Sequence, residues 1–108
     1  MYTTGKFAKL ANVSERTIRY YDKIGLLKPS IIQDNGYRKY NDNDFIRLQN
    51  ILILKKLGFS LEEIETILLD QSSWVDSLQT QMELVTQKIK YFQNIKDTLA
   101  KTIEIVKN

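Results

Sequence analysis

One segment near the N-terminus combines a helix-capping residue with closely spaced basic and aromatic side chains. Residues 13–22 have the sequence Val13-Ser14-Glu15-Arg16-Thr17-Ile18-Arg19-Tyr20-Tyr21-Asp22. Ser14 is a favourable N-cap, and the acidic Glu15 then lies near the positive end of the helix. Arg16 and Arg19 are three residues apart, so they share one helix face. The segment therefore predicts a short helix, ending at about Ile24, with a basic face.

A second short helix is expected just before this segment. Thr3 is a good N-cap for a helix over Thr4 to Ala11, and Asn12-Val13 forms the turn between the two helices. We expect the core-facing side of the first helix to carry Phe7, Ala8, Leu10 and Ala11. In a helix-turn-helix, the second helix enters the major groove of DNA, where arginines bind phosphates or guanine. The alternative is that the arginines form surface ion pairs.

A tight turn at Asp34-Asn35-Gly36 predicts a β-hairpin. We expect Leu26–Pro29 to form an edge strand and Tyr37–Tyr40 to form the strand that follows the turn. Alternation places Arg38 and Tyr40 on one face of this second strand. Cations beside aromatic rings fit a hairpin tip that reaches the nucleic-acid backbone, the winged variant of the helix-turn-helix; a purely structural hairpin is the alternative.

Two further helices are expected before residue 70. Asn41 or Asp42 caps the first, which ends at Gly58. Ser60 and Glu63 have the spacing of a capping box and begin the second. We therefore predict a first domain over residues 1–70 and a second over 71–108.

The last segment, from about Trp74, has the pattern of one long coiled-coil helix. Ten positions follow the 3-4 spacing, and nine of them are apolar, Lys96 being the exception: Val75, Leu78, Met82, Val85, Ile89, Phe92, Leu99, Ile103 and Val106. About 34 residues span roughly 50 Å, more than the roughly 34 Å of a compact domain of this length. We expect the apolar seam to bind a second copy of the chain; a helix folded back on its own domain is the alternative.

Composition narrows the function classes. Cysteine and histidine are absent from the 108 residues, which weighs against an enzyme and removes thiolate metal sites. No apolar run is long enough for a membrane span, and we expect a cytoplasmic location. The net charge of +3 hides a basic first half and an acidic second half, so only the first half is suited to a polyanion.

Five motifs in order resemble the N-terminal DNA-binding domain of the MerR family of bacterial transcription regulators. They are Thr3-x-x-x-x-Ala8-Lys9, Val13-Ser14-x-Arg16-Thr17-Ile18-Arg19-Tyr20-Tyr21-Asp22, Gly25-Leu26-Leu27-x-Pro29, Gly36-Tyr37-Arg38-x-Tyr40 and Leu57-Gly58-Phe59-Ser60-Leu61-x-x-Ile64. The resemblance implies a mainly helical, winged helix-turn-helix fold with a long helix that pairs antiparallel with its mate. It implies DNA contacts by Thr3, Ser14, Arg16, Thr17, Arg19, Tyr20, Tyr37, Arg38 and Lys39.

The resemblance also implies a function. Members bind pseudo-palindromic promoter operators as homodimers and distort the DNA so that RNA polymerase can use the promoter. The absence of cysteine separates this chain from the metal-sensing branch, and no cofactor is expected. The long helix is similar to that of drug- and thiopeptide-sensing members, which bind small-molecule effectors through a further C-terminal domain. Leu84, Tyr91 and Ile105 widen the apolar arc, which favours a longer native protein over a naturally short regulator.

One rival function comes from a different class. A protein-interaction module would use the long helix to dock another protein and would not bind DNA. Salt separates the two, because phosphate contacts weaken steeply as salt rises, whereas an apolar helix contact hardly responds.

Overall fold

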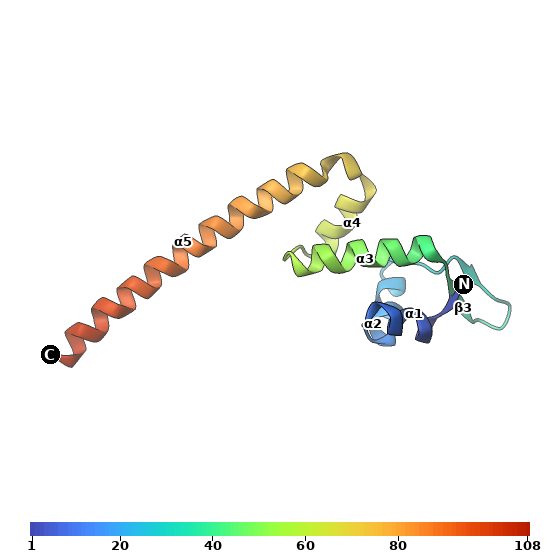
Figure 1. Cartoon of the computed structure of the whole chain (residues 1–108), viewed down its shortest axis with the longest axis horizontal. Coiled ribbons are helices and arrows are strands. Elements are labelled where there is room, and N and C mark those ends of the chain that lie inside the picture. The colour runs from blue at the N-terminus through green and yellow to red at the C-terminus, as the bar shows by residue number, and fades with distance from the viewer. The chain divides into compact units, whose positions relative to one another are not determined.

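A computed structural model describes all residues, 1–108 (Figure 1). The chain divides into two compact units, Met1–Leu68 and Leu69–Asn108. The first unit contains a small sheet and the shorter helices, and the second contains the long C-terminal helix. The mainly helical fold class, with a small β-hairpin and a long C-terminal helix, is confirmed.

Helix α1 (Thr4–Ala11) has the predicted bounds. Thr3 caps it, because its Oγ1 accepts a hydrogen bond of 3.2 Å from the backbone N–H of Lys6. Asn12 ends the helix in the left-handed region with φ at 58°, which asparagine tolerates better than most residues. The turn can therefore be short without a glycine.

Helix α2 (Glu15–Lys23) begins at its predicted cap. Ser14 Oγ accepts a hydrogen bond of 3.1 Å from the N–H of Thr17, and the two hydroxyls lie 2.9 Å apart. Gly25 follows the helix with φ at 80°, a conformation that glycine adopts without strain.

Helix α3 (Asp42–Lys56) begins with a capping box between Asn41 and Asp44. Asn41 Oδ1 accepts from the N–H of Asp44 at 2.8 Å, and Asp44 Oδ2 accepts from the N–H of Asn41 at 2.9 Å. The short fourth helix, α4 (Leu61–Leu69), begins with a capping box between Ser60 and Glu63.

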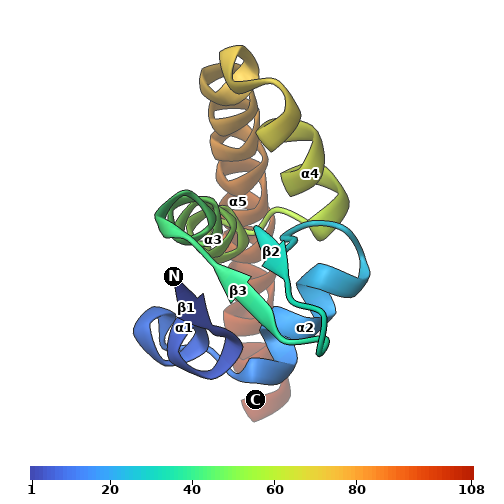
Figure 2. The same cartoon turned by 90° about the vertical axis from the view of Figure 1, so that its right-hand side faces the viewer.

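The three strands form an antiparallel sheet with β3 in the middle, as Figure 2 shows. They are β1 (Tyr2–Thr3), β2 (Ile31–Ile32) and β3 (Arg38–Tyr40). The hairpin of β2, β3 and their connecting turn, residues 31–40, is called the wing below. Strand β1 was not predicted, and its pairing with β3 joins the wing to the start of the chain.

The expected edge strand at Leu26–Pro29 is wrong. The N–H groups of Leu26 and Leu27 donate to the carbonyl oxygen of Tyr21, at 2.9 and 3.1 Å, so these residues complete the end of α2. Both leucine side chains are buried in the core, and neither residue belongs to a strand. The first strand of the hairpin comes later, at Ile31–Ile32.

The core of the first unit is centred on aromatic stacking. The ring of Tyr40 lies 4.4 Å from that of Phe7 and nearly parallel to it, and Phe45 packs edge-on against Phe7 at 5.9 Å. Leu10 was expected in this core, but its side chain is 53% exposed. The buried hydrophobic residues are Phe7, Ala8, Ile18, Tyr21, Leu26, Leu27, Tyr40, Leu48, Ile51, Leu54, Phe59, Ile64 and Ile67.

The second unit consists of a 3₁₀ turn (Gln71–Ser73) and helix α5 (Trp74–Lys107), which begins where the sequence predicts. Neither proline nor glycine interrupts α5. None of its 34 residues is buried. None of the helices combines the length and the apolar composition that crossing a lipid bilayer requires.

Candidate nucleic-acid interface

Helix α2 presents the predicted basic face. Arg16 and Arg19 are exposed. Arg19 approaches Glu15 one turn earlier at 4.0 Å, but their side chains are 66% and 51% exposed. Such an exposed pair contributes little, so Arg19 remains available to a phosphate.

The two predicted hydroxyl residues at the start of α2 have a structural role. Ser14 Oγ accepts the Thr17 N–H, and the neighbouring hydroxyls share a hydrogen bond. They therefore fix the start of the helix that carries the arginines. A hydroxyl oxygen with two lone pairs can still meet a phosphate while it caps a helix.

Two adjacent tyrosines on α2 differ in environment. Tyr20 is 50% exposed, whereas Tyr21 is buried. Burial raises the pKa of the Tyr21 phenol, and the neighbouring Tyr20 raises it further. Tyr21 thus belongs to the core, and Tyr20 is the ring that a ligand can reach.

The wing is held in shape by its turn and by one ion pair. Asn35 Oδ1 accepts from the N–H of Tyr37 at 3.1 Å, and Gly36 has φ at 83°. Tyr37 is 67% exposed. Arg38 Nε donates to Asp22 Oδ2 on α2 at 2.6 Å, a partner that sequence spacing did not indicate.

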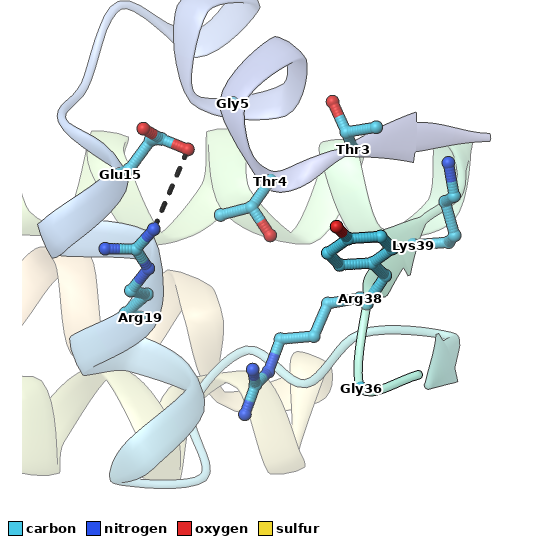
Figure 3. Close-up of a pocket in the computed structure, with 9 residues that line it drawn as sticks. Thr3, Thr4, Gly5, Glu15, Arg19, Gly36, Arg38 and Lys39 are labelled. Atoms are coloured by element: carbon cyan, nitrogen blue, oxygen red, sulfur yellow. Dashed lines mark ion pairs between the residues drawn. The ribbon is translucent and has the colours of Figure 1, made fainter. Parts of the chain in front are cut away.

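A hollow of about 460 Å³ lies between α2, the start of α1 and the wing (Figure 3). Arg19 borders it from α2, and Arg38 and Lys39 border it from β3. Glu15 is the only carboxylate in the lining. With the Asp22 carboxylate that pairs with Arg38 also counted, three cations still face two anions, so the hollow is suited to a phosphate group. Its full lining is Thr3, Thr4, Gly5, Glu15, Arg19, Gly36, Tyr37, Arg38 and Lys39.

Five of the predicted DNA-binding residues therefore meet at one place. They are Thr3, Arg19, Tyr37, Arg38 and Lys39. Arg16 and Thr17 on α2, and Ser14 at its cap, lie outside this lining. Tyr20 lines a different hollow, with Ile24, Leu26 and the start of α4. Thr4, Glu15 and Asp22 were not predicted, because their role depends on contacts across the fold.

The predicted seam of α5 is exposed along its length. Every apolar seam residue from Val75 to Val106 is at least 36% exposed. Three threonines of the helix bond back to its own backbone: Thr86, Thr98 and Thr102 each donate to the carbonyl oxygen four residues earlier. These three hydroxyls are thus satisfied within the helix, whereas the apolar seam residues are not covered.

No group of three or more His, Cys, Asp or Glu side chains could hold a metal ion. Residues 2–71 match the family model described as "MerR HTH family regulatory protein". Residues 45–102 match the family model described as "MerR, DNA binding".

The chain belongs to the MerR family. It is similar to the HTH-type transcriptional activator mta of Bacillus subtilis, 38% identical over 106 residues, which cover 94% of this chain and 40% of that protein. It thus spans about two fifths of the length of the curated relatives it matches first.

Solved structures of MerR proteins share the fold. The crystal structure of MtaN, the N-terminus of the Bacillus subtilis multidrug transporter activator, matches with a TM-score of 0.86 and 37% identity, over 95% of this chain and 98% of that one. HiNmlR, a MerR family regulator lacking the sensor domain and bound to promoter DNA, matches with a TM-score of 0.64 and 28% identity, over 94% and 86%. Both matches include the long helix as well as the first unit, because each covers more than nine tenths of this chain.

Proposed function

We propose that the protein is a sequence-specific DNA-binding transcription regulator that binds a pseudo-palindromic promoter operator as a homodimer and distorts the DNA. The observation that carries this proposal is the hollow between α2 and the wing, where Arg19, Arg38 and Lys39 converge. Phosphate contacts fix the protein on the duplex, and the exposed Arg16 on α2 is free to reach base edges. A relative named as a transcriptional activator and a structural neighbour bound to promoter DNA support it.

The dimer in this proposal forms through the apolar seam of α5. A two-fold dimer places two recognition helices and two wings on the DNA, which matches a pseudo-palindromic operator. Gripping the backbone at two separated sites allows the protein to bend or untwist the duplex between them. The remaining partners are RNA polymerase at the promoter and a small-molecule effector that acts through a C-terminal domain, and the site of action is the bacterial cytoplasm, at the nucleoid.

Binding to a duplex selected from a randomised library tests the proposal. We expect the dissociation constant to rise steeply with salt, because phosphate contacts release counterions. Arg16→Ala and Arg19→Ala are each expected to cost about 1–3 kcal/mol of binding free energy. Lys101→Ala is the matched control, since it removes one cation from α5 and is expected to have little effect.

Two results would contradict this proposal. One is selection of no preferred sequence, together with binding that does not depend on salt. The other is near-wild-type affinity for both arginine variants in a folded dimer. The first result would favour a protein-interaction module, and the second would overturn the assignment of Arg16 and Arg19 as DNA-binding residues.

A further inference from the structure

The ion pair between Asp22 and Arg38 joins the recognition helix to the wing. Arg38 Nε donates to Asp22 Oδ2 at 2.6 Å, across sixteen residues of sequence. The side chain of Asp22 is 14% exposed and that of Arg38 is 44% exposed. The carboxylate is therefore largely enclosed, while the guanidinium lies partly at the surface.

The bond leaves the phosphate-binding part of Arg38 unused. Asp22 receives only the Nε–H group, so the four N–H groups on Nη1 and Nη2 are left for a ligand. Arg38 also lines the cationic hollow, toward which Arg19 and Lys39 contribute their charges. Figure 3 shows the Arg38 side chain extending from β3 toward α2.

Considered by its charge alone, Asp22 would weaken DNA binding. A carboxylate near a phosphate-binding surface repels the phosphates and lowers affinity. A flexible arginine, however, loses rotamer freedom when it binds, and an arginine already held in place loses less. The enclosed Asp22 carboxylate fixes the Arg38 guanidinium at the border of the hollow. Asp22 also sits close enough to the buried Tyr40 to raise the pKa of its phenol, after the larger effect of burial.

We propose that Asp22 is a positioning residue that orients Arg38 toward a DNA phosphate and couples the wing to the recognition helix. The inference rests on the proposed function, because the ligand of Arg38 is taken to be the DNA backbone. The ion pair would make α2 and the wing bind DNA as one rigid unit instead of as two independent contacts.

The test is a set of binding measurements on the selected duplex over a range of salt concentrations. Asp22→Asn is expected to weaken DNA binding about tenfold, although it removes a negative charge. A tenfold loss lies within the range of interaction energies between residues in direct contact. It should also flatten the plot of log affinity against log salt by about one unit, as Arg38→Ala should, because one phosphate contact is lost. In the Arg38→Ala background, Asp22→Asn should cause no further loss. Asp22→Glu, which keeps the carboxylate, should restore part of the affinity.

Asp34→Asn is the matched control. Asp34 is exposed in the turn of the wing and forms no ion pair, so the same loss of charge should leave the affinity unchanged or raise it. Arg38→Lys is a second probe that leaves Asp22 untouched. Arginine can bind the carboxylate through Nε and a phosphate through its two terminal amino groups at the same time. Lysine keeps the charge but has a single ammonium group, so the affinity for DNA should fall several-fold.

Three results would overturn the proposal. Asp22→Asn could bind as tightly as the wild type with the same salt slope, or weaken binding equally when Arg38 is already alanine. Arg38→Lys could bind like the wild type, a result that decides the matter even where Asp22→Asn does not fold. If the wild-type chain itself shows no salt-dependent binding, the proposed function fails, and this inference fails with it.

Discussion

The two units treat their apolar side chains in opposite ways. Every buried hydrophobic residue of the chain lies in the first unit, between Phe7 and Ile67. Helix α5 has thirteen large apolar side chains that are exposed and none that is buried. The first unit thus has a core of its own, whereas the apolar side chains of α5 are uncovered. The same kind of residue stabilises a fold in the first unit, whereas in α5 it forms the exposed surface through which we propose that the dimer assembles.

The largest expected effect comes from a charge in the seam of α5. Ile89→Glu should convert the proposed dimer to a monomer in sedimentation, because burying an unpaired carboxylate costs several kcal/mol in each subunit. Tight operator binding should be lost with the dimer. Gln87→Glu adds the same charge two residues away, outside the seam, and should leave the dimer intact. A dimeric Ile89→Glu protein would place the interface elsewhere.

The direction of the helix pair is the next test. The chain has no cysteine, so single cysteines can be introduced cleanly. In an antiparallel pair, Val75→Cys in one protomer should form a disulfide with Val106→Cys in the other, and Val75→Cys alone should stay reduced. Efficient disulfide formation between two Val75→Cys protomers would mean a parallel pair. Lys96 would then face its own copy at an inner position and repel it.

A core substitution should affect only the first unit. Phe7→Ala removes the ring stacked on Tyr40 and is expected to cost about 3–5 kcal/mol of unfolding free energy. Hydrogen exchange should show lost protection in the first unit, while α5 keeps its protection in the dimer. Leu10→Ala is the control, because Leu10 is half exposed and should cost far less. Equal losses for both variants would contradict the core described above.

The smallest expected effect is at the cap of α4. Glu63 Oε1 accepts a hydrogen bond of 2.9 Å from the backbone N–H of Ser60. This bond, followed by a bond from the Ser60 side chain, lowers the pKa of the Glu63 carboxyl below its usual value of 4.5. Because the folded pKa is lowered, the stabilisation is present above pH 4.5 and is lost as the pH falls through the folded value. Thermal unfolding of Glu63→Gln should therefore lose a small part of its pH dependence in this acid range. Glu62→Gln, which changes a neighbour outside the cap, should retain the full dependence.

The sequence predicts the helices well because their signals are local. Thr3, Ser14 and Ser60 each cap the helix that they were expected to cap, and Asn41, one of the two candidates, caps α3. Such a cap needs partners only two or three residues away, so its spacing is visible in the sequence. The seam of α5 is equally visible, since it repeats along one helix.

The errors concern contacts between distant residues. Strand β1 has two residues, too few for an alternating pattern, and its partner is β3. Leu26 and Leu27 were given to a strand because apolar pairs before a proline fit one, but the backbone bonds at the end of α2 bury them in the core. In the candidate site, the sequence identified the cations but not Asp22, because a carboxylate sixteen residues away carries no local sign of its partner.

The pairing of β1 with β3 has a consequence for the order of folding. Thr3 lies opposite Lys39, so this pairing closes a loop of about 35 residues that contains both helices of the helix-turn-helix. Closing such a loop costs chain entropy before any contact rewards it, and contacts of this range form slowly. During synthesis, Tyr2 and Thr3 leave the ribosome first but find their partners only after α1 and α2 have been made. We therefore expect β1 to pair with β3 late in folding, after the two helices between them have been synthesised.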